Sequence, residues 1–475
     1  MSKARRVYLL NPRQLPPETI AVAFAKTSRS PLAFDEIAAE LTDRSSAQFH
    51  EKWVVGYGHA SVAEHAVLHL AIENVSRLAV EALESSRLAS YTEKSTRYQK
   101  WDAESFHLPE EFQAEPARSQ YLDTVRHLFS VYLDMLPRLE QAARITHPRQ
   151  PDESRSAWEG RIRTAYVDVA RFLLPAASLA NLGITINARN LEYQLTKFFS
   201  HPLSEVRRLA AEVKEIAKAE VPTLVKYAEP SAYLERSAVE LKQCAEKTAD
   251  DLITARDFCQ LVHWDDELED RLLAAALYRF SNNDYTQLIE RMEHAPPQTK
   301  QEIAQALLGG LSPHDIPRRE IEHACFTFDI ILDQGAFYEL KRHRMLTLTA
   351  QPLTPHLGYA TPSMIAQTGF LDLYQEAMNA AQVAYERVAD INPDSASYIV
   401  PNGYNRRVLL TLNLRSAAHL VRLRSGKTAH FSIRRVARRM AEIIQEKAPL
   451  LAQFINWGEP ESWRDIEKQH FIKTQ

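Results

Sequence analysis

The chain has 475 residues, of which 57 are Lys or Arg and 61 are Asp or Glu, so that its formal net charge is −4. This balance argues against a nucleic-acid coat protein or a polybasic membrane binder, while it leaves room for a local basic pocket. Hydrophobic residues make up 45% of the sequence, which is ample for the buried cores of about two to four domains.

Glycine is scarce, with 12 residues, and none falls in a G-x-G-x-x-G or G-x-x-x-x-G-K pattern. We therefore expect phosphate groups to be held by side chains and helix ends. The three cysteines form no C-x-x-C motif, which argues against a zinc ribbon or a disulfide scaffold and favours a reducing compartment. The longest uncharged stretch, between Phe172 and Arg189, is too short and too polar to span a membrane, so we expect a cytoplasmic protein.

The predicted elements of the first half follow one another in a simple order. Apolar and polar residues alternate over Val67–Ile72, which predicts a half-buried strand. Apolar residues then recur every three or four positions, which predicts helices over Ser76–Leu88 and Ser204–Tyr227. A charged helical connector is expected over Ser237–Asp257.

The same elements return in the second half of the chain. The predicted strand and the two helices cover Phe326–Ile331, Gln334–Met345 and Ser432–Phe454. Polar landmarks return with them: Glu64-His65 corresponds to Glu322-His323, at an offset of 258 residues (65 to 323). An order of unusual residues that is kept at near-constant spacing indicates an internal repeat.

A later landmark has a smaller offset. Asn187-Ala188-Arg189 corresponds to Asn413-Leu414-Arg415, at an offset of 226 residues (187 to 413), because the first half carries extra residues between Asp102 and Glu159. We interpret the pattern as a tandem duplication, with a first domain over residues 1–240 and a second over 241–475. The expected fold class is α+β, each copy having a small, mainly antiparallel sheet with flanking helices.

Two short segments carry residue types suited to binding chemistry. Arg342-His343-Arg344 lies at the C-terminal end of a predicted helix. Cations stabilise the helix dipole there, and they equally suit a clamp on a diphosphate or an anionic ring. In the first copy, the loop from Ser90 to Tyr98 combines hydroxyls with Arg97. Such a loop can bind a phosphate or a pyrimidine edge, or it can be a turn capped by its own hydroxyls.

Together, these residues resemble the flavin-dependent thymidylate synthases, once in each half. The family motif reads Arg-His-Arg, seven residues, Ser, one residue, Arg-Tyr, and it follows a segment similar to residues 58–65. The first copy keeps the second part of the motif but has Ser85-Ser86 in place of the first Arg-His. The second copy keeps Arg342-His343-Arg344 but has Pro352 in place of the serine. Proline has neither a hydroxyl nor a backbone donor.

Because the losses are complementary, the resemblance implies one site assembled from both copies. The residues that would bind dUMP are Glu93, Ser95, Arg97 and Arg171. The residues that would bind FAD are Arg342, His343, Arg344, Asn413 and Arg415, together with His59, Ser61, Asn187 and Arg189. Arg424 would be catalytic by polarising the uracil ring, whereas the first copy has Phe198 in that register.

The resemblance implies reductive methylation of dUMP to dTMP, with methylenetetrahydrofolate as carbon donor and NADPH as reductant through FAD. It also implies a homodimer that imitates the homotetramer of the family, a small-molecule nucleotide as substrate, and neither a membrane nor a nucleic acid as partner. Two alternatives stay open: an inactive duplicated relative that binds flavin or nucleotide, and another flavin-dependent pyrimidine or nucleic-acid methylation. No metal site is expected, because Glu64-His65-x-x-x-His69 lacks the H-E-x-x-H order.

Overall fold

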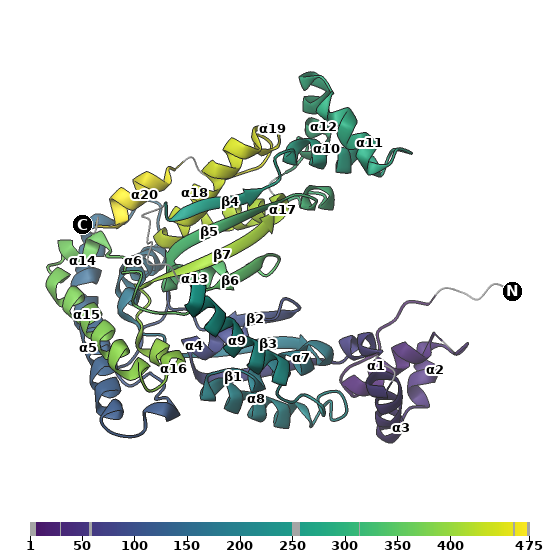
Figure 1. The fold of residues 1–475 in the computed structure, drawn as a ribbon, viewed down its shortest axis with the longest axis horizontal. Helices are drawn as coiled ribbons and strands as arrows, with labels where there is room; N and C mark the ends of the chain where they lie inside the picture. The colour runs from purple at the N-terminus through teal and green to yellow at the C-terminus, as the bar shows by residue number, and fades with distance from the viewer. Residues whose placement is uncertain are drawn as a thin grey trace. The chain divides into compact units, whose positions relative to one another are not determined.

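The computed structural model describes residues 6–28, 30–56, 59–248, 257–312, 314–458 and 461–472 (Figure 1). The chain forms two compact units, each built from several segments. The first unit comprises Met1–Lys94, Phe106–Ala114 and Ser178–Leu252, and the second comprises Ser95–Ser105, Glu115–Ala177 and Ile253–Gln475. The second unit therefore takes two segments from the first half of the sequence, and these segments carry Ser95, Arg97 and Arg171.

The first unit contains a three-stranded antiparallel sheet in the order β1-β3-β2. Its strands are β1 (Val67–Ser76), β2 (Ala89–Glu93) and β3 (Leu179–Asn187). Its α-helices are α1 (Pro17–Lys26), α2 (Phe34–Ala39), α3 (Asp43–Phe49), α4 (Arg77–Leu83), α7 (Ala188–Phe199), α8 (Ser204–Ala217) and α9 (Ala232–Thr248). A π-helix, η1 (His50–Gly56), and the 3-10 helices η2 (Ala60–His65) and η3 (Glu110–Phe112) complete the described elements.

The second unit contains a four-stranded antiparallel sheet in the order β4-β5-β7-β6. Its strands are β4 (Cys259–Trp264), β5 (Cys325–Asp333), β6 (Thr347–Ala350) and β7 (Asn405–Asn413). Its longer helices are α5 (Ala117–Thr146), α6 (Arg155–Ala170), α10 (Leu268–Tyr278), α11 (Tyr285–Glu293), α12 (Pro297–Leu308), α15 (Leu371–Ala389), α17 (Leu414–Arg424), α18 (Phe431–Lys447) and α20 (Trp463–His470). The shorter ones are η4 (Arg171–Leu173), η5 (Arg319–Glu322), α13 (Gln334–Leu340), α14 (Ser363–Gln367), α16 (Pro393–Ala396), η6 (Ser397–Ile399) and α19 (Pro449–Ala452).

The two sheets share one plan, which confirms the predicted α+β duplication. In each copy a strand leads into a short helix and an edge strand, and the chain later returns as the central strand followed by two helices. The pairing registers also correspond, because Val67 lies opposite Asn187 in the first sheet and Cys325 lies opposite Asn413 in the second. The offset shrinks because α5 has 30 residues and is followed by α6, whereas α15 has 19 residues.

The predicted helices are too long at their C-terminal ends. Helix α4 ends at Leu83 and α13 at Leu340, so Arg342-His343-Arg344 lies just beyond its helix. Helices α8 and α18 end at Ala217 and Lys447, short of the predicted bounds. Prolines stop the later extensions, since Pro222 and Pro449 cannot continue the hydrogen-bond ladder. Helix α9 begins at Ala232, ahead of the predicted connector, and residues 249–256 of that connector fall outside the described part of the chain.

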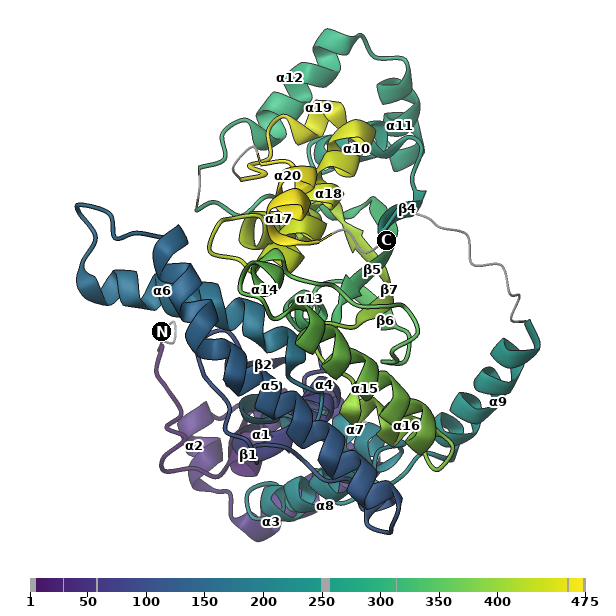
Figure 2. The same cartoon turned by 90° about the vertical axis from the view of Figure 1, so that its left-hand side faces the viewer.

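The second unit has a continuous hydrophobic core beneath its sheet. Alternate residues of β5 point inward, so that Phe326, Phe328 and Ile330 are fully buried. Helix α18 packs against this sheet and contributes buried residues along one side (Figure 1). Helices α5 and α15 lie side by side along much of their length (Figure 2). Among the described residues, no helix has the length and apolar character that crossing a membrane requires.

The helix that follows the first strand is capped differently in the two copies. Ser76 caps α4, and its backbone N–H and hydroxyl donate to the buried carboxylate of Glu205 at 2.9 and 2.6 Å. At the corresponding cap in the second copy, Asp333 accepts from the N–H of Ala336 at 2.9 Å. The hydroxyl of Ser432 approaches Asp333 without forming a well-aligned hydrogen bond. The first copy thus has a serine at the cap and a glutamate on the later helix, whereas the second copy has an aspartate at the cap and a serine on the later helix.

Candidate active site

Arg97 follows β2 in the sequence and belongs to the second unit, where two partners of the same unit hold it. Its Nε and Nη2 donate to Oδ1 and Oδ2 of Asp168 on α6 at 2.9 and 2.8 Å, and its Nη1 donates to the carbonyl of Thr428 at 3.0 Å. Both charged side chains are largely buried. Burial alone would lower the pKa of Arg97, but the hydrogen bonds and charge of Asp168 raise it overall. The arginine is therefore a fixed cation with a planar bidentate contact.

Arg171 is completely buried at the start of η4. Its Nη2 donates to Oε1 of Glu339 at 3.3 Å, and its Nη1 lies 3.4 Å from the hydroxyl of Thr96. Its backbone carbonyl accepts from the side chain of Asn402 at 3.0 Å. The Nε–H has no hydrogen-bond partner among the described residues, which leaves one buried donor unsatisfied.

Arg424, at the end of α17, contacts His343 of the Arg-His-Arg triplet and the carboxylate of Glu339. Its Nε donates to Nε2 of His343 at 3.0 Å, and its Nη1 donates to Oε2 of Glu339 at 3.2 Å. Because Nε2 of His343 is the acceptor, the ring carries its proton on Nδ1. Burial, with further contributions from Arg424 and His419, lowers the pKa of His343 to about 3. The ring is therefore neutral at pH 7.

These contacts join predicted residues from both halves into one network. Glu339 bonds to Arg171 from the first half and to Arg424 from the second half. Burial lowers the pKa of Arg424, Glu339 raises it, and the nearby cations Arg342 and Arg97 lower it further. The structure thus brings Arg97, Arg171, His343 and Arg424 together, with Asp168 and Glu339 as their anionic partners.

The remaining residues of the two motif fragments lie near this network in the chain. Ser95 accepts a hydrogen bond from the backbone N–H of Arg97 at 3.2 Å. This contact is a turn capped by its own hydroxyl, one of the two alternatives that the sequence allows for this loop. Arg342 is exposed and Arg344 half-buried, on either side of the buried His343. Two arginines flanking a neutral ring can bind an extended anion such as a diphosphate.

Asn413 and Arg415, predicted to bind flavin, already have local roles. The side chain of Asn413 caps α17 by accepting from the N–H of Ser416 at 2.8 Å. Arg415 Nη1 pairs with Glu322 at 2.5 Å, while its buried Nε–H has no hydrogen-bond partner among the described residues. The arginine therefore keeps one unsatisfied donor for an anionic ligand.

The first copy shows the same cap and the same ion pair. Asn187 caps α7 by accepting from the N–H of Asn190 at 2.9 Å, and Arg189 pairs with Glu64. Both arginines are thus bound to the glutamate of the Glu-His landmark that precedes the first strand of their copy. This repeated pairing explains why the two landmarks occur together in each half.

Three other predicted residues belong to the first unit. Glu93 forms an ion pair with Arg77, and both side chains are almost fully buried. The ring of His59 lies 6.0 Å from that of Trp53, and Ser61 is exposed on η2. Within the first unit, Glu93 is therefore part of a buried ion pair, while His59 and Ser61 are exposed.

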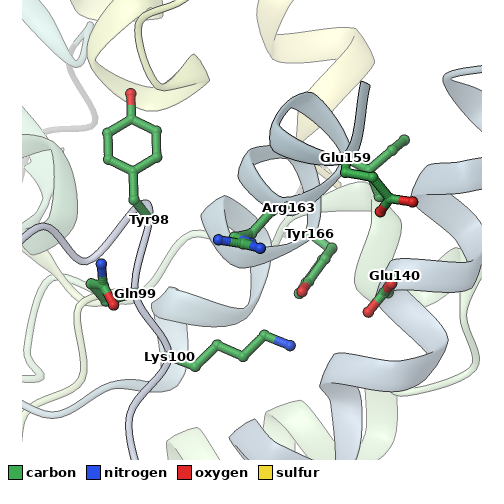
Figure 3. Close-up of a pocket in the computed structure, with 8 residues that line it drawn as sticks. Tyr98, Gln99, Lys100, Glu140, Glu159, Arg163 and Tyr166 are labelled. Carbon is green, nitrogen blue, oxygen red and sulfur yellow. The ribbon is translucent and has the colours of Figure 1, made fainter. Parts of the chain in front are cut away.

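A pocket of about 490 Å³ lies beside the loop that follows Arg97 (Figure 3). It is lined by Tyr98, Gln99, Lys100, Glu140, Glu159, Ile162, Arg163 and Tyr166. The amine of Lys100 lies 5.1 Å from the ring centroid of Tyr166, and the two glutamates are paired with Arg144. None of the network arginines lines this pocket, so it is an opening next to the loop that carries Arg97 rather than the network itself.

The sequence did not single out Asp168 or Glu339. A weak signal exists for each, because Asp168 lies three residues before Arg171 and Glu339 lies three residues before Arg342. That spacing places acid and arginine on one helical face. The observed partners are different, however: Asp168 binds Arg97, and Glu339 binds Arg171 and Arg424.

The sequence matches the family model described as thymidylate synthase complementing protein twice, over residues 12–223 and 260–450. It is 31% identical over 435 residues to a UPF0159 protein of Chlamydia muridarum, covering 88% of this chain and 82% of the relative. It is 27% identical over 461 residues to a UPF0159 protein of Thermoplasma acidophilum, covering 88% and 90%. A flavin-dependent thymidylate synthase of Clostridium tetani is 29% identical over 221 residues, covering 45% of this chain and 83% of the relative.

Proposed function

The chain belongs to the thymidylate synthase complementing protein family, and from this membership we propose that it is a flavin-dependent thymidylate synthase. The proposed reaction is the reductive methylation of dUMP to dTMP, with methylenetetrahydrofolate as carbon donor, NADPH as reductant and FAD as cofactor. A relative named flavin-dependent thymidylate synthase matches about half of this chain. The proposal assigns one active site to residues from both copies.

The observation that carries the proposal is the arginine network of the second unit. Arg97 and Arg171 come from the copy that retains the nucleotide part of the motif, and Arg424 comes from the copy that retains Arg-His-Arg. Arg171 and Arg424 share Glu339 as hydrogen-bond acceptor, and Arg97 is paired with Asp168, whose charge also acts on Arg171. Buried arginines held by hydrogen bonds are fixed in position, which preorganises their charge around the proposed nucleotide site. In the proposed site Ser95, Arg97 and Arg171 bind dUMP, with Glu93 as a further contributor.

The residues of the second copy fit a flavin dinucleotide by the chemistry of their donors. Arg342 and Arg344 flank His343, and Arg415 retains a buried N–H without a partner in the described structure. We propose that these residues hold FAD together with Asn413, and that His59, Ser61, Asn187 and Arg189 contribute from the first copy. FAD in its reduced form supplies hydride chemistry, while the protein supplies orientation and electrostatics.

Arg424 is the proposed catalytic residue. As an arginine it stays protonated even though burial lowers its pKa. Its Nε is tied to His343 and its Nη1 to Glu339, so the orientation of the planar guanidinium is fixed. A fixed cation stabilises negative charge that develops on a uracil ring.

We propose that the duplicated chain works as a homodimer in the cytoplasm, with the copies divided near residue 240. Two duplicated chains would supply the four family domains that the resemblance assigns to a homotetramer. The substrate is a small-molecule nucleotide, and neither a membrane nor a nucleic acid is part of the proposal.

The test is tritium release from dUMP labelled at ring carbon five, with flavin absorption of the purified protein as a separate reading. Arg424→Ala and Ser95→Ala are expected to reduce release at least about a hundredfold, since each removes a preorganised contact. Arg126→Ala is the matched control, because Arg126 pairs with Glu104 on the surface of the same unit. Native protein that binds flavin but releases no tritium would contradict the synthase proposal.

A second candidate is a relative that binds flavin or nucleotide without turnover. It is favoured by the fact that Arg97, Arg171 and Arg424 are already paired with carboxylates. A flavin-dependent methylation of another pyrimidine or of a nucleic acid is a variant of the first proposal. Tritium release with dUMP separates the first proposal from both, since neither of them predicts it.

A further inference from the structure

Glu339 receives hydrogen bonds from arginines of both copies. Its Oε1 accepts from Arg171 at 3.3 Å, and its Oε2 accepts from Arg424 at 3.2 Å. The side chain is only 8% exposed. It also acts on Arg97, whose pKa it helps to raise. One carboxylate therefore bonds to two arginines and acts electrostatically on a third, and the proposed function assigns all three to dUMP or its ring.

A carboxylate and a phosphate use the same donors of a guanidinium group. Both bind through paired, charge-assisted N–H···O contacts. A donor of Arg171 that bonds to Glu339 is thus not available to a phosphate in the same geometry. A phosphate dianion close to a buried carboxylate is also repelled by it, at a distance where water screens the charges weakly. The substrate must therefore compete with a group that belongs to the protein.

We propose that Glu339 is a specificity-determining residue that competes with the substrate phosphate for Arg171. In the nucleotide-free protein its carboxylate holds Arg171 and Arg424, and it releases the donor of Arg171 to the phosphate when a phosphorylated pyrimidine binds. This inference rests on the proposed function in taking dUMP as the ligand. It goes beyond that function by naming the group that sets the affinity for the anionic part of the substrate.

The experiment measures binding by calorimetry to the native full-length protein and to Glu339→Gln. The amide keeps an acceptor of nearly the same shape and removes the negative charge. Dissociation constants for dUMP and for inorganic phosphate are expected to fall about tenfold. The constant for deoxyuridine, which has no phosphate, is expected to stay unchanged. Glu467→Gln is the matched control, because Glu467 pairs with Arg435 at 2.8 Å in the same unit and should change none of the three constants.

Unchanged or weaker binding of phosphate and dUMP by Glu339→Gln would overturn the inference, as would an equal gain for deoxyuridine. If Glu339→Gln gains affinity for inorganic phosphate while neither protein binds dUMP, the inference stands and the proposed function fails. Should Glu339→Gln not fold, Glu339→Asp keeps the charge but shortens the side chain, so that its hold on the two arginines loosens. We expect about threefold tighter phosphate binding for that variant, and binding no tighter than native overturns the inference.

Discussion

At the scale of single residues, burial decides what an arginine–carboxylate pair contributes. Arg97–Asp168 and Arg126–Glu104 are both bidentate, with N···O distances between 2.8 and 3.0 Å. The first pair is largely buried, whereas the side chains of the second are 50% and 65% exposed. Removing one partner of a buried pair leaves an uncompensated charge in a poorly solvated place. Removing one partner of an exposed pair leaves a charge in water.

We therefore predict that Asp168→Asn destabilises the protein by about 3 kcal/mol, whereas Glu104→Gln has no measurable effect on stability. The measurement is the free energy of unfolding in urea, with both variants compared at pH 7. Equal losses for the two variants would show that the pair at Arg97 is solvated in solution.

A second residue-scale prediction concerns pH and His201 in the first unit. Its Nδ1 accepts from the N–H of Leu203 at 3.2 Å, and burial lowers its pKa to about 4. The unfolded chain has an ordinary value near 6.5 and so binds a proton first as the pH falls. The stability that the neutral ring contributes is present above pH 6.5 and is lost as the pH falls from 6.5 toward 4. At pH 5 the loss amounts to about 2 kcal/mol.

Substituting His201→Asn keeps an acceptor for Leu203 and removes the titration. Unfolding measured between pH 7 and pH 5 is expected to show a smaller loss of stability for this variant than for the native protein. Other buried histidines, such as His343, contribute to the change of unfolding free energy with pH in both proteins. An equal loss of unfolding free energy between pH 7 and pH 5 in both proteins would mean that His201 titrates normally in the folded state.

At the scale of elements, the exchanged cap partners make the duplication testable. Ser76→Asp places a second carboxylate against Glu205 and is expected to cost about 3 kcal/mol of stability. Adding Glu205→Ser reproduces the acid–hydroxyl arrangement of Asp333 and Ser432 and is expected to recover at least half of that loss. The four proteins form a double-mutant cycle, read from their unfolding free energies. Additive losses would contradict the equivalence of the two caps.

The strands and the repeat could be predicted from the sequence because both depend on local order. Alternation along β1 and β5 reflects one buried face of a sheet, and the polar landmarks recur at fixed offsets. The helix ends after α4 and α13 could not be predicted, because apolar residues such as Leu88 and Met345 continue the helical spacing beyond the turn. In the folded chain these residues belong to the approach to the edge strand.

The network could be predicted only in part for a similar reason. Motif resemblance supplied Arg97, Arg171 and Arg424, whose types and spacing are visible in the chain. It did not supply their partners, since Asp168 lies 71 residues from Arg97 and Glu339 lies 168 residues from Arg171. Contacts at such separations depend on the packing of α6 and α13, which no local pattern specifies.

At the scale of the whole molecule, the proposed site depends on both halves being present. A fragment of residues 241–475 lacks Arg97, Asp168 and Arg171, and it exposes the face of α15 that packs on α5. We predict that this fragment is unstable alone and releases no tritium from labelled dUMP, because two of the three network arginines are missing. Thermal melting and the release assay measure both effects. A fragment that turns over alone would contradict a site shared between copies.

The segmented second unit has a consequence for how the protein is made. The chain passes from one unit to the other at residues 94, 105, 114, 177 and 252. During synthesis, Arg97, Asp168 and Arg171 leave the ribosome long before Glu339 and Arg424 have been translated. Helix α5 must therefore wait, with the face that packs on α15 uncovered, for a partner encoded more than a hundred codons downstream. Nascent chains stalled before residue 253 should be the species that chaperones hold longest.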